Sequence, residues 1–409
     1  AVDRARRGVA LARVVVGVSG GIAAYKVASV VRGLAEAGHE VRVVPTRAAL
    51  EFVGAATWEA LSGAPVHTEV FADVPSVPHV RLGQQADLVL VAPATADLLA
   101  RAAHGLADDL LTSTLLTARC PVVMAPAMHT EMWEHAATEA NVATLRDRGV
   151  LVLEPAVGRL TGADSGPGRM PEPDDLLAAA RAVLEHPTTR DLAGRHVLVT
   201  AGATQEPLDP VRYLSNHSSG RQGWALARVA ALRGAAVTLV TGPTALADPA
   251  GVDVVRVGTA VQMLQAVLAH VEQADAVVMS AAVVDHRPAE ASAHKIKKGD
   301  GETERTLRLV ANPDILAGLA AEHGPGRVVV GFAAETGEPG ADVLELGARK
   351  LEAKGCDLLV VNEVGEGRAF GTPDNAAVVL GRDGSRTDVP TGSKERLAGV
   401  VWDLVADRL

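Results

Sequence analysis

The stretch APAMHTEMW places a single histidine, His129, between a run of small apolar residues and a segment with one acidic residue, Glu131. An imidazole at such a position can act as a base, bind a metal ion or donate a hydrogen bond. Glu131, Glu134 and His135 lie nearby, but their spacing matches no zinc motif such as H-E-x-x-H. The sequence therefore argues against a metal site and leaves a substrate contact or a plain loop residue open for His129.

A glycine-rich turn, VSGGIAAYK, follows the first apolar run of the chain. Peptide N–H groups at the start of a helix attract anions, and Gly20 and Gly21 let the backbone approach a phosphate closely. Glycine also joins strands to helices for structural reasons alone. The sequence lacks G-x-G-x-x-G, an acidic residue after the second strand, and the G-K-[ST] of a P-loop. A mononucleotide phosphate held by Ser19, the glycine amides and Thr46 fits these features best.

Other polar residues stand where ligands bind in α/β proteins. Pro93, Thr95 and Asp97 follow a buried strand, although Thr95 or Asp97 could simply cap a helix. KIKK supplies Lys295, Lys297 and Lys298 on a glycine-rich loop, where the lysines could bind phosphate or only face solvent. Lys350 and Lys354 are four apart on an expected helix, so both could face one phosphate or lie on an ordinary helix surface. In SSGRQG, Ser218, Ser219 and Gly220 open a helix and suit a substrate phosphate.

Branched apolar runs alternate with alanine-rich segments of helix length. This pattern predicts an α/β protein with two Rossmann-like three-layer domains, mainly parallel sheets and a flavodoxin-like first domain. In the first half we expect helices at 23–37 and 130–148, and strands at 13–18, 40–44, 88–92, 122–125 and 150–153. In the second half we expect strands at 197–201, 236–240, 276–280, 328–332 and 358–362, a hairpin around RDGS and a helix from about Lys394.

Length and composition set the remaining bounds. A chain of 409 residues suggests two domains, and the polar segment TTRDLAGRH puts their boundary near Arg190, giving domains 1–189 and 190–409. A net charge of -10 and 2% aromatic residues argue against a nucleic-acid surface. No apolar run reaches the roughly 18 residues of a membrane span. Two cysteines, Cys120 and Cys356, fit a reducing cytoplasm.

Longer motifs make both halves similar to known families. VGVSGGIAAYK, PHVRLG, APATADLLARAAHGLADDLL, PAM and SGPGRM resemble the flavin-containing cysteine decarboxylases. TAGATQEPLDPVRYLSNHSSGRQG, AAVVDHRP, KIKK, NPDIL, GFAAET and KLEAKGCDLLVVN resemble the phosphopantothenate–cysteine ligases. Their order and fusion resemble the bifunctional family of bacterial coenzyme A biosynthesis.

The resemblance to the decarboxylases implies FMN as cofactor. The matching FMN residues are Ser19, Gly20, Gly21, Ile22, Thr46, Pro93, Thr95 and Asp97. The family is thought to oxidise the cysteine thiol to a thioaldehyde, lose CO2 and return a hydride to the resulting enethiolate. His79, in PHVRLG, matches the catalytic histidine, which would orient or deprotonate the substrate.

Two positions depart from the decarboxylase pattern. The family's PAMN motif has an asparagine that binds the substrate carboxylate, and this chain has His129 there. The family's flap cysteine falls on Gly162, and relatives without this cysteine that act on peptides can stop at the enethiol. We therefore expect His129 to act as a partly charge-assisted carboxylate clamp. We expect Asp164, Ser165 or an ordered water to support the final reduction.

The resemblance to the ligases implies CTP as co-substrate and an acyl-cytidylate of 4'-phosphopantothenate that cysteine then attacks. Asn216 would contact the acyl-cytidylate, and Lys295 would support its turnover. The nucleotide contacts would fall on Met279, Ser280, Ala281, Asp285, Lys295, Asn312, Pro313, Asp314, Ile315, Phe332, Lys350 and Lys354. Mg2+ would offset the phosphate charge, with Asp285 as its candidate ligand.

Alternatives remain open at this point. The flavin half could be degenerate and serve only as an oligomerising scaffold, or it could stop at the enethiol. A regulatory binding protein and an NAD-dependent reductase fit the motifs less well. Trimers of the decarboxylase family and dimers of the ligase family together imply a homo-oligomer of four trimers, a dodecamer.

Overall fold

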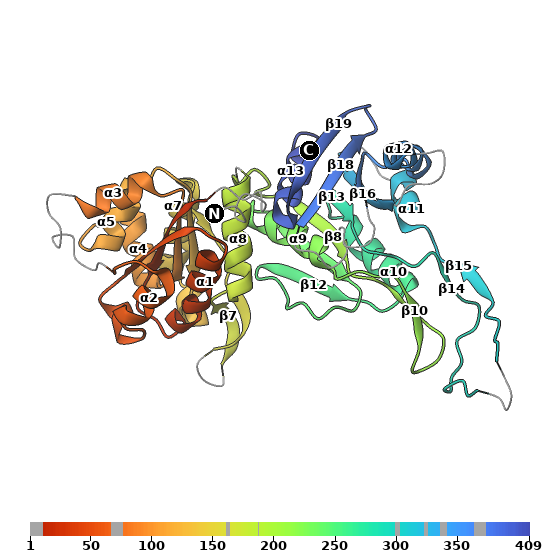
Figure 1. Ribbon diagram of the computed structural model, residues 1–409, viewed down its shortest axis with the longest axis horizontal. Coiled ribbons are helices and arrows are strands. Elements are labelled where there is room, and N and C mark those ends of the chain that lie inside the picture. The colour runs from red at the N-terminus through yellow and green to blue at the C-terminus, as the bar shows by residue number, and fades with distance from the viewer. Residues whose placement is uncertain are drawn as a thin grey trace. The chain divides into compact units, whose positions relative to one another are not determined.

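The computed structural model of the chain describes residues 11–66, 77–160, 164–186, 188–298, 303–322, 326–335, 342–363 and 374–409. The chain forms two compact units, one of residues 1–191 with 249–251 and one of residues 192–248 with 252–409 (Figure 1). Each unit is built on a mainly parallel sheet with helices packed against it, which confirms the predicted α/β class. No helix among the described residues is long and apolar enough to cross a membrane.

The first unit contains a five-stranded sheet in the order β2-β1-β3-β4-β5, which is the flavodoxin order. Its parallel strands are β1 Arg13–Val18, β2 Glu40–Pro45, β3 Leu88–Ala94, β4 Val122–Pro126 and β5 Leu151–Val152. Its helices are α1 Ala24–Glu36, η2 Ala48–Glu51, α2 Ala55–Ser62, α3 Pro78–Gln85, α4 Ala96–His104, α5 Leu110–Thr117, α6 Thr130–Trp133, α7 Ala136–Asp147 and α8 Pro173–Glu185. The strands expected from the sequence are confirmed, with small differences at their ends.

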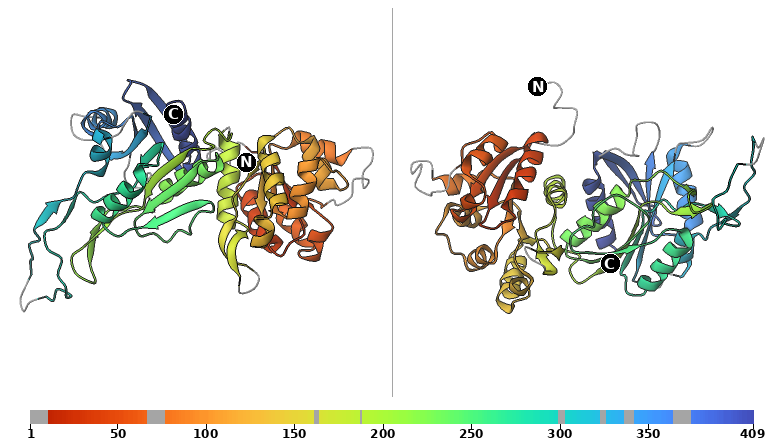
Figure 2. Two further views of the ribbon diagram at one scale, coloured as in Figure 1. Left: turned by 180° about the vertical axis from the view of Figure 1, so that it is seen from behind. Right: turned by 90° about the horizontal axis from the view of Figure 1, so that it is seen from below.

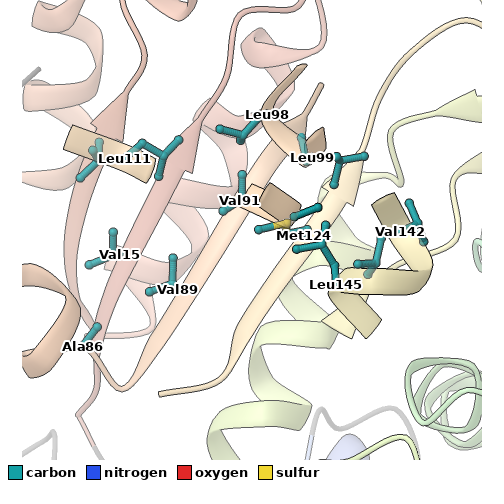
Figure 3. Close-up of a cluster of buried hydrophobic side chains, with 14 of the residues drawn as sticks. Val15, Ala86, Val89, Val91, Leu98, Leu99, Leu111, Met124, Val142 and Leu145 are labelled. Atoms are coloured by element: carbon teal, nitrogen blue, oxygen red, sulfur yellow. The ribbon is translucent and has the colours of Figure 1, made fainter. Parts of the chain in front are cut away.

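The core on one face of this sheet joins β1, β3 and β4 to α4, α5 and α7 (Figure 3). Val91 of β3 and Met124 of β4 meet Leu99 of α4, Leu111 of α5 and Leu145 of α7 in this cluster. All seven residues of β3 are buried, so the strand packs on both faces. Burial on both faces is the reason that these parallel strands read as continuous apolar runs.

The single helix expected at 130–148 is wrong, because the structure has two helices there. Helix α6 ends at Trp133 and α7 begins at Ala136. His135 lies between them in an extended conformation, and its Nδ1 accepts the N–H of Ala137 at 3.1 Å. A side chain that accepts a hydrogen bond from the first turn ends the earlier helix and begins a new one. Apolar periodicity alone does not show such a break.

The second unit contains an eight-stranded sheet in the order β12-β11-β8-β13-β16-β17-β18-β19. The six parallel strands are β8 His196–Ala201, β11 Ala236–Thr241, β12 Val252–Arg256, β13 Ala276–Met279, β16 Val328–Glu335 and β17 Leu358–Glu363. These six have the Rossmann order 3-2-1-4-5-6. The predicted hairpin is confirmed as β18 Asp374–Gly381 and β19 Arg386–Ser393. The helices are α9 Arg221–Leu232, α10 Ala260–Val271, α11 Ile315–Glu322, α12 Val343–Lys354 and α13 Lys394–Ala406.

Three short antiparallel ribbons lie outside the two main sheets. They pair β6 Ala156–Arg159 with β7 Ser165–Arg169, β9 Gln205–Pro207 with β10 Tyr213–Ser215, and β14 His286–Pro288 with β15 Leu309–Ala311. Within the second unit, the connection between β14 and β15 extends well away from the main sheet (Figures 1 and 2). These ribbons were not expected from the sequence, because they are short and rich in proline, glycine or charged residues.

Candidate functional site

The first candidate site lies at the carboxyl ends of β1 and β3, where the strand order of the first sheet reverses. Gly21 follows β1, and Pro93 and Thr95 lie at the end of β3. A Cβ atom placed on Gly21 would lie 3.6 Å from Thr95 Cγ2 and 3.8 Å from Pro93 Cγ. The structure therefore brings these three residues together, with the glycine loop facing the end of β3.

Ser19 ties the two loops to each other. Its hydroxyl donates to the carbonyl oxygen of Pro93 at 2.7 Å and accepts the N–H of Thr95 at 3.0 Å. The side chain is buried and its hydroxyl is engaged, so its direct task is to fix the loops. The peptide N–H groups of Gly20, Gly21 and Ile22 have no partner among the described residues. Unpaired amides at the start of a helix are suited to donate to an anion.

The glycine loop also packs tightly against the segment after β2. A Cβ atom on Gly20 would lie 2.4 Å from the Cβ of Ala48, so the backbone here admits only glycine. Thr46 Oγ1 accepts the N–H of Ala49 at 3.2 Å, which caps η2. Its N–H donates to the carbonyl oxygen of Val18 at 2.8 Å. A hydroxyl that accepts one hydrogen bond can still donate its own, so Thr46 can serve an anion at this loop.

Asp97 has a structural partner in the same helix. Thr95 Oγ1 accepts the N–H of Leu98 at 3.4 Å and caps α4, as its helix-cap interpretation expects. Asp97 is exposed in the first turn of α4 and lies 3.7 Å from Arg101. Arg101 also pairs with Asp109 at 3.1 Å, which joins α4 to the start of α5. The contacts of Asp97 are therefore those of a helix-surface ion pair.

His129 lies in a segment that the β6–β7 hairpin fixes on both sides. The N–H of Met128 donates to the carbonyl oxygen of Gly168 at 2.9 Å, and Thr130 Oγ1 donates to that of Pro167 at 2.7 Å. A Cβ atom on Gly168, where φ is +136°, would lie 2.3 Å from the carbonyl oxygen of Met128. Gly168, the second glycine of SGPGRM, is thus required because it contacts this segment directly. The His129 side chain itself is exposed.

His79 lies in the first turn of α3, against α5. Its carbonyl oxygen accepts a hydrogen bond from Thr117 Oγ1 at 2.8 Å. Its Nδ1 is buried and has no hydrogen-bond partner among the described atoms. A buried polar atom without a partner is uncommon, which marks Nδ1 as a candidate for a substrate contact. Gly162 lies outside the described residues. Asp164 accepts the N–H of Leu160 at 2.9 Å with its carbonyl oxygen, and Ser165 begins β7.

The second candidate site lies at the carboxyl ends of β8 and β13, where the order of the second sheet reverses. The segments that follow β8 and β13 continue side by side beyond the strands, since Ala203 and Ala282 form a parallel bridge. Ser280 Oγ donates to the carbonyl oxygen of Thr200 at 2.6 Å, and the N–H of Ala281 donates to Thr200 Oγ1 at 3.2 Å. Thr200 therefore holds the segment that follows Met279 against β8.

Two asparagines hold the same segment from other elements. Asn216 Nδ2 donates to the carbonyl oxygen of Val283 at 3.2 Å. Asn312 Nδ2 donates to that of Val284 at 2.7 Å, and the Asn312 N–H donates to that of Asp285 at 2.8 Å. The structure thus brings Asn216, the segment after Met279 and Asn312 together.

The predicted phosphate segment begins α9 beside this site. Ser218 Oγ accepts the N–H of Gly220 at 3.3 Å, and Gly220, with φ of +74°, directly precedes the helix. Ser219 precedes Gly220, and its carbonyl oxygen accepts a hydrogen bond from Thr244 Oγ1 at 3.5 Å. A Cβ atom on Gly223 would lie 2.9 Å from Ser280 Oγ. The first turn of α9 therefore lies directly against Ser280.

Three of the predicted nucleotide residues form an ionic group at α11 and α12. Lys350 and Lys354 lie one turn apart on α12, and Lys354 is paired with Asp314 just before α11. Burial would raise the pKa of Asp314, but the hydrogen bonds from Lys354 and Ala317 and the lysine charges hold it below its usual range. Pro313 and Ile315 flank Asp314, and Phe332 lies on β16.

The lysine segment has a different neighbour. Lys295, Lys297 and Lys298 lie on the connection between β14 and β15, and Ile296, which stands between the first two, contacts the turn between β9 and β10. Between the lysines, the Ile296 N–H donates to Asp209 Oδ2 at 3.1 Å and its carbonyl oxygen accepts from Arg212 Nη2 at 2.7 Å. Sequence reasoning missed Asp209 and Arg212. The available signal was DPVR, which stands immediately before YLSN.

Comparison with known proteins covers both units. The flavoprotein family matches residues 5–185, and the DNA/pantothenate metabolism flavoprotein C-terminal domain matches residues 192–409. The coenzyme A biosynthesis bifunctional protein of Mycobacterium tuberculosis (strain ATCC 25618 / H37Rv) is 61% identical over 401 residues, which is 96% of each chain. That of Mycolicibacterium smegmatis is 60% identical over 402 residues, 96% of this chain and 97% of the relative. A crystal structure of the C-terminal domain of such a protein is 34% identical, with a TM-score of 0.45, and covers 53% of this chain and 97% of that one.

Proposed function

Because the chain belongs to the family of coenzyme A biosynthesis bifunctional proteins, we propose that it catalyses two consecutive reactions. The second unit ligates 4'-phosphopantothenate to cysteine with CTP, and the first decarboxylates the product to 4'-phosphopantetheine. The observation that carries the proposal is that motif residues of each half, such as Gly21 and Thr95 in the first and Asn216 and Asn312 in the second, gather where the strand order of its own sheet reverses. Ligands of open α/β sheets bind at such positions.

In the ligase half, the carboxylate of 4'-phosphopantothenate must be activated before an amine can attack it. Transfer to CTP gives an acyl-cytidylate and pyrophosphate, and cysteine then displaces CMP. Lys350 and Lys354 offset phosphate charge, as does Mg2+ entering with the nucleotide, for which the exposed Asp285 is the candidate ligand. Asn216 donates one side-chain N–H to the carbonyl oxygen of Val283. Its other N–H and its oxygen remain to orient the acyl group.

The decarboxylase half fits FMN at the glycine loop. The peptide N–H groups of Gly20, Gly21 and Ile22 and the Thr46 hydroxyl suit its phosphate, and a side chain at residue 21 would fill the space toward Thr95. When bound, FMN supplies the reversible two-electron oxidation of the substrate thiol on which loss of CO2 depends. His79 Nδ1 binds or deprotonates the substrate, and His129 holds its carboxylate.

The assembly proposed for this enzyme is a cytoplasmic dodecamer of flavin-domain trimers joined by ligase dimers. Its support is the family resemblance of both halves. Native mass spectrometry tests it directly: a mass of twelve chains is expected, and a stable monomer would contradict it.

The deciding experiment incubates the full chain with 4'-phosphopantothenate, cysteine and either CTP or ATP, followed by mass analysis. We expect CMP, pyrophosphate and phosphopantothenoylcysteine with CTP, and then phosphopantetheine. The absence of any ligated product would contradict the ligase function, and ligation without release of CO2 would contradict the decarboxylase function.

A second outcome is favoured by one feature of the sequence, the glycine at position 162 where the family has its flap cysteine. Without a thiol at that position, decarboxylation can end at the enethiol. That product would be lighter than phosphopantetheine by two hydrogen atoms. The same mass analysis therefore separates complete decarboxylation from decarboxylation without reduction.

A further inference from the structure

The turn between β9 and β10 contains a buried carboxylate, Asp209, which has no role in the reaction steps proposed above. Its side chain is 0% exposed. Oδ1 accepts the N–H groups of Val211 at 2.8 Å and Arg212 at 2.9 Å. Oδ2 accepts from Arg212 Nε at 3.0 Å, from Arg212 Nη2 at 2.6 Å and from the N–H of Ile296 at 3.1 Å. One carboxylate thus organises its own turn and a segment 87 residues further along the chain.

Ile296 is held at both ends of its backbone. Asp209 accepts its N–H, and Arg212 Nη2 donates to its carbonyl oxygen at 2.7 Å. Two hydrogen bonds to one residue restrict both the position and the rotation of the peptides around it. Those peptides lead directly to Lys295 on one side and Lys297 on the other. The Asp209–Arg212 pair therefore controls where the lysine segment lies.

The described residues of the connection make few other hydrogen bonds to the rest of the unit. These residues, 289–298 and 303–308, contain no helix or strand. The N–H of Ser292 donates to the carbonyl oxygen of Leu208 at 2.9 Å, which again reaches the β9–β10 turn. Arg305 Nη2 donates to the carbonyl oxygen of Lys297 at 3.1 Å within the connection itself. Segments with few hydrogen bonds open at low cost in free energy, so the loss of Asp209 would release this one.

The negative charge of Asp209 is essential to the arrangement. The hydrogen bonds from Arg212 hold its pKa far below the usual range against the opposing effect of burial, so the group is ionised under all working conditions. Hydrogen bonds to an ionised acceptor are roughly twice as strong as those between neutral groups. An amide in the same place would turn an N–H toward Arg212 or Ile296, which are themselves donors.

We propose that Asp209 is a positioning residue of the ligase reaction, which fixes Lys295 through the peptide of Ile296 and contacts no substrate itself. The proposal rests on the proposed ligase function and adds a residue to it. Lysine side chains are long and flexible, and a misplaced backbone moves the ammonium group further still. A displacement of about 1 Å can lower a rate by a factor on the order of 100.

The first test compares Asp209→Asn with Asp383→Asn, a substitution of a turn carboxylate that is 58% exposed. Asp383 is also a turn carboxylate that accepts a backbone N–H, from Ser385 at 2.9 Å, and an arginine, Arg408 at 2.6 Å, but it lies in the β18–β19 turn. We expect Asp209→Asn to lower the kcat of ligation roughly 10- to 100-fold and Asp383→Asn to change it less than about twofold. Decarboxylation of supplied phosphopantothenoylcysteine should be unchanged in both. An unchanged ligation rate in Asp209→Asn overturns the proposal.

A double-mutant cycle separates positioning from a general loss of structure. In a Lys295→Ala background, Asp209→Asn should lower the ligation rate by less than about twofold, because the side chain that it positions is already gone. A loss as large as in the wild-type background would mean that Asp209 acts on the fold alone and overturns the proposal. If Asp209→Asn does not fold, Asp209→Glu, which keeps the charge and displaces it, carries the same cycle.

Limited digestion with trypsin tests the anchor without any catalysis. Cleavage after Lys295, Lys297 and Lys298, followed by mass spectrometry, should be several-fold faster in Asp209→Asn than in wild type or in Asp383→Asn. Equal cleavage in all three proteins would overturn the proposal. If the wild-type chain makes no phosphopantothenoylcysteine, the proposed function has failed, and the digestion still decides whether Asp209 holds the segment.

Discussion

At the level of single residues, His129 has a fixed backbone and an exposed side chain. Met128 and Thr130 on either side of it are hydrogen-bonded to β7. Because an imidazole can add positive charge to a hydrogen bond, we expect His129→Ala to raise the KM for phosphopantothenoylcysteine about tenfold, the effect of losing about 1.4 kcal/mol of binding. Steady-state decarboxylation measures this KM. The thermal midpoint should change little, since an exposed side chain has few packing contacts to lose.

His135 and the substitution His129→Asn serve as controls for this prediction. His135→Ala removes the cap of α7 and should lower stability by about 1 kcal/mol while leaving the KM unchanged. His129→Asn restores the amide of the related enzymes, so it should keep the KM closer to the wild-type value than His129→Ala does. Equal KM values in His129→Ala and wild type would rule out the clamp.

At the level of elements, the hairpin of β6 and β7 is essential to the His129 segment. Gly168→Ala would place a Cβ atom 2.3 Å from the carbonyl oxygen of Met128 at a φ of +136°. Such a contact between a side chain and backbone must displace the hairpin or strain it by about 1–3 kcal/mol. We therefore expect decarboxylation to fall at least roughly tenfold, while ligation, carried by the other unit, stays at the wild-type rate.

The control for the hairpin is Gly63→Ala at the end of α2. Gly63 has a φ of +68°, yet nothing lies within 4 Å of the position of an added Cβ atom. This substitution should lower the stability by only about 1 kcal/mol, because alanine is less favourable than glycine in the left-handed conformation. Decarboxylation should stay intact. Equal losses of decarboxylation in the two variants would show that the contact with Met128 is not the cause.

The start of β1 contains a pH-sensitive contact. The N–H of Ala12 donates to Nδ1 of His39 at 3.3 Å, and burial lowers the pKa of His39 below its usual value. The folded state therefore favours the neutral ring. The stability that it contributes is fully present above the unfolded pKa of about 6.5 and is lost as the pH falls through the lower folded pKa.

The expected result is a difference in how steeply the thermal midpoint falls with decreasing pH. Between about pH 7.5 and pH 5, the thermal midpoint of the first unit should fall more steeply in wild type than in His39→Gln. His104→Gln, at an exposed position at the end of α4, should follow the wild-type curve. Parallel curves for wild type and His39→Gln would show that the ring does not titrate with folding.

The sequence predicts those elements whose pattern repeats within one segment. Val14 and Val15 of β1 are both buried, so the strand has apolar side chains on both faces and is visible as a continuous run. Motif residues such as Gly21 and Thr95 could be predicted to converge because parallel strands end at one edge of a sheet. The break at His135 could not be predicted, because it depends on one capping hydrogen bond. The link from Asp209 to Ile296 spans 87 residues and follows no periodicity.

At the level of the whole molecule, the two proposed reactions are assigned to units with separate hydrophobic cores. A ligand that binds only the folded form of one unit stabilises that unit by mass action, by about 2.7 kcal/mol at a concentration of 100 Kd. Scanning calorimetry of the full chain should therefore resolve two unfolding transitions. FMN should raise the midpoint of one, and CTP with Mg2+ should raise the midpoint of the other.

A single glycine variant assigns the two transitions. In Gly20→Val the added Cβ atom would lie 2.4 Å from the Cβ of Ala48, which distorts the loop proposed to hold the FMN phosphate. The transition that responds to FMN in wild type should lose that response, whereas the response of the other to CTP should persist unchanged, because the residues proposed to bind the nucleotide all lie in the second unit. A single transition whose midpoint both ligands raise would instead show that the two units unfold as one cooperative body.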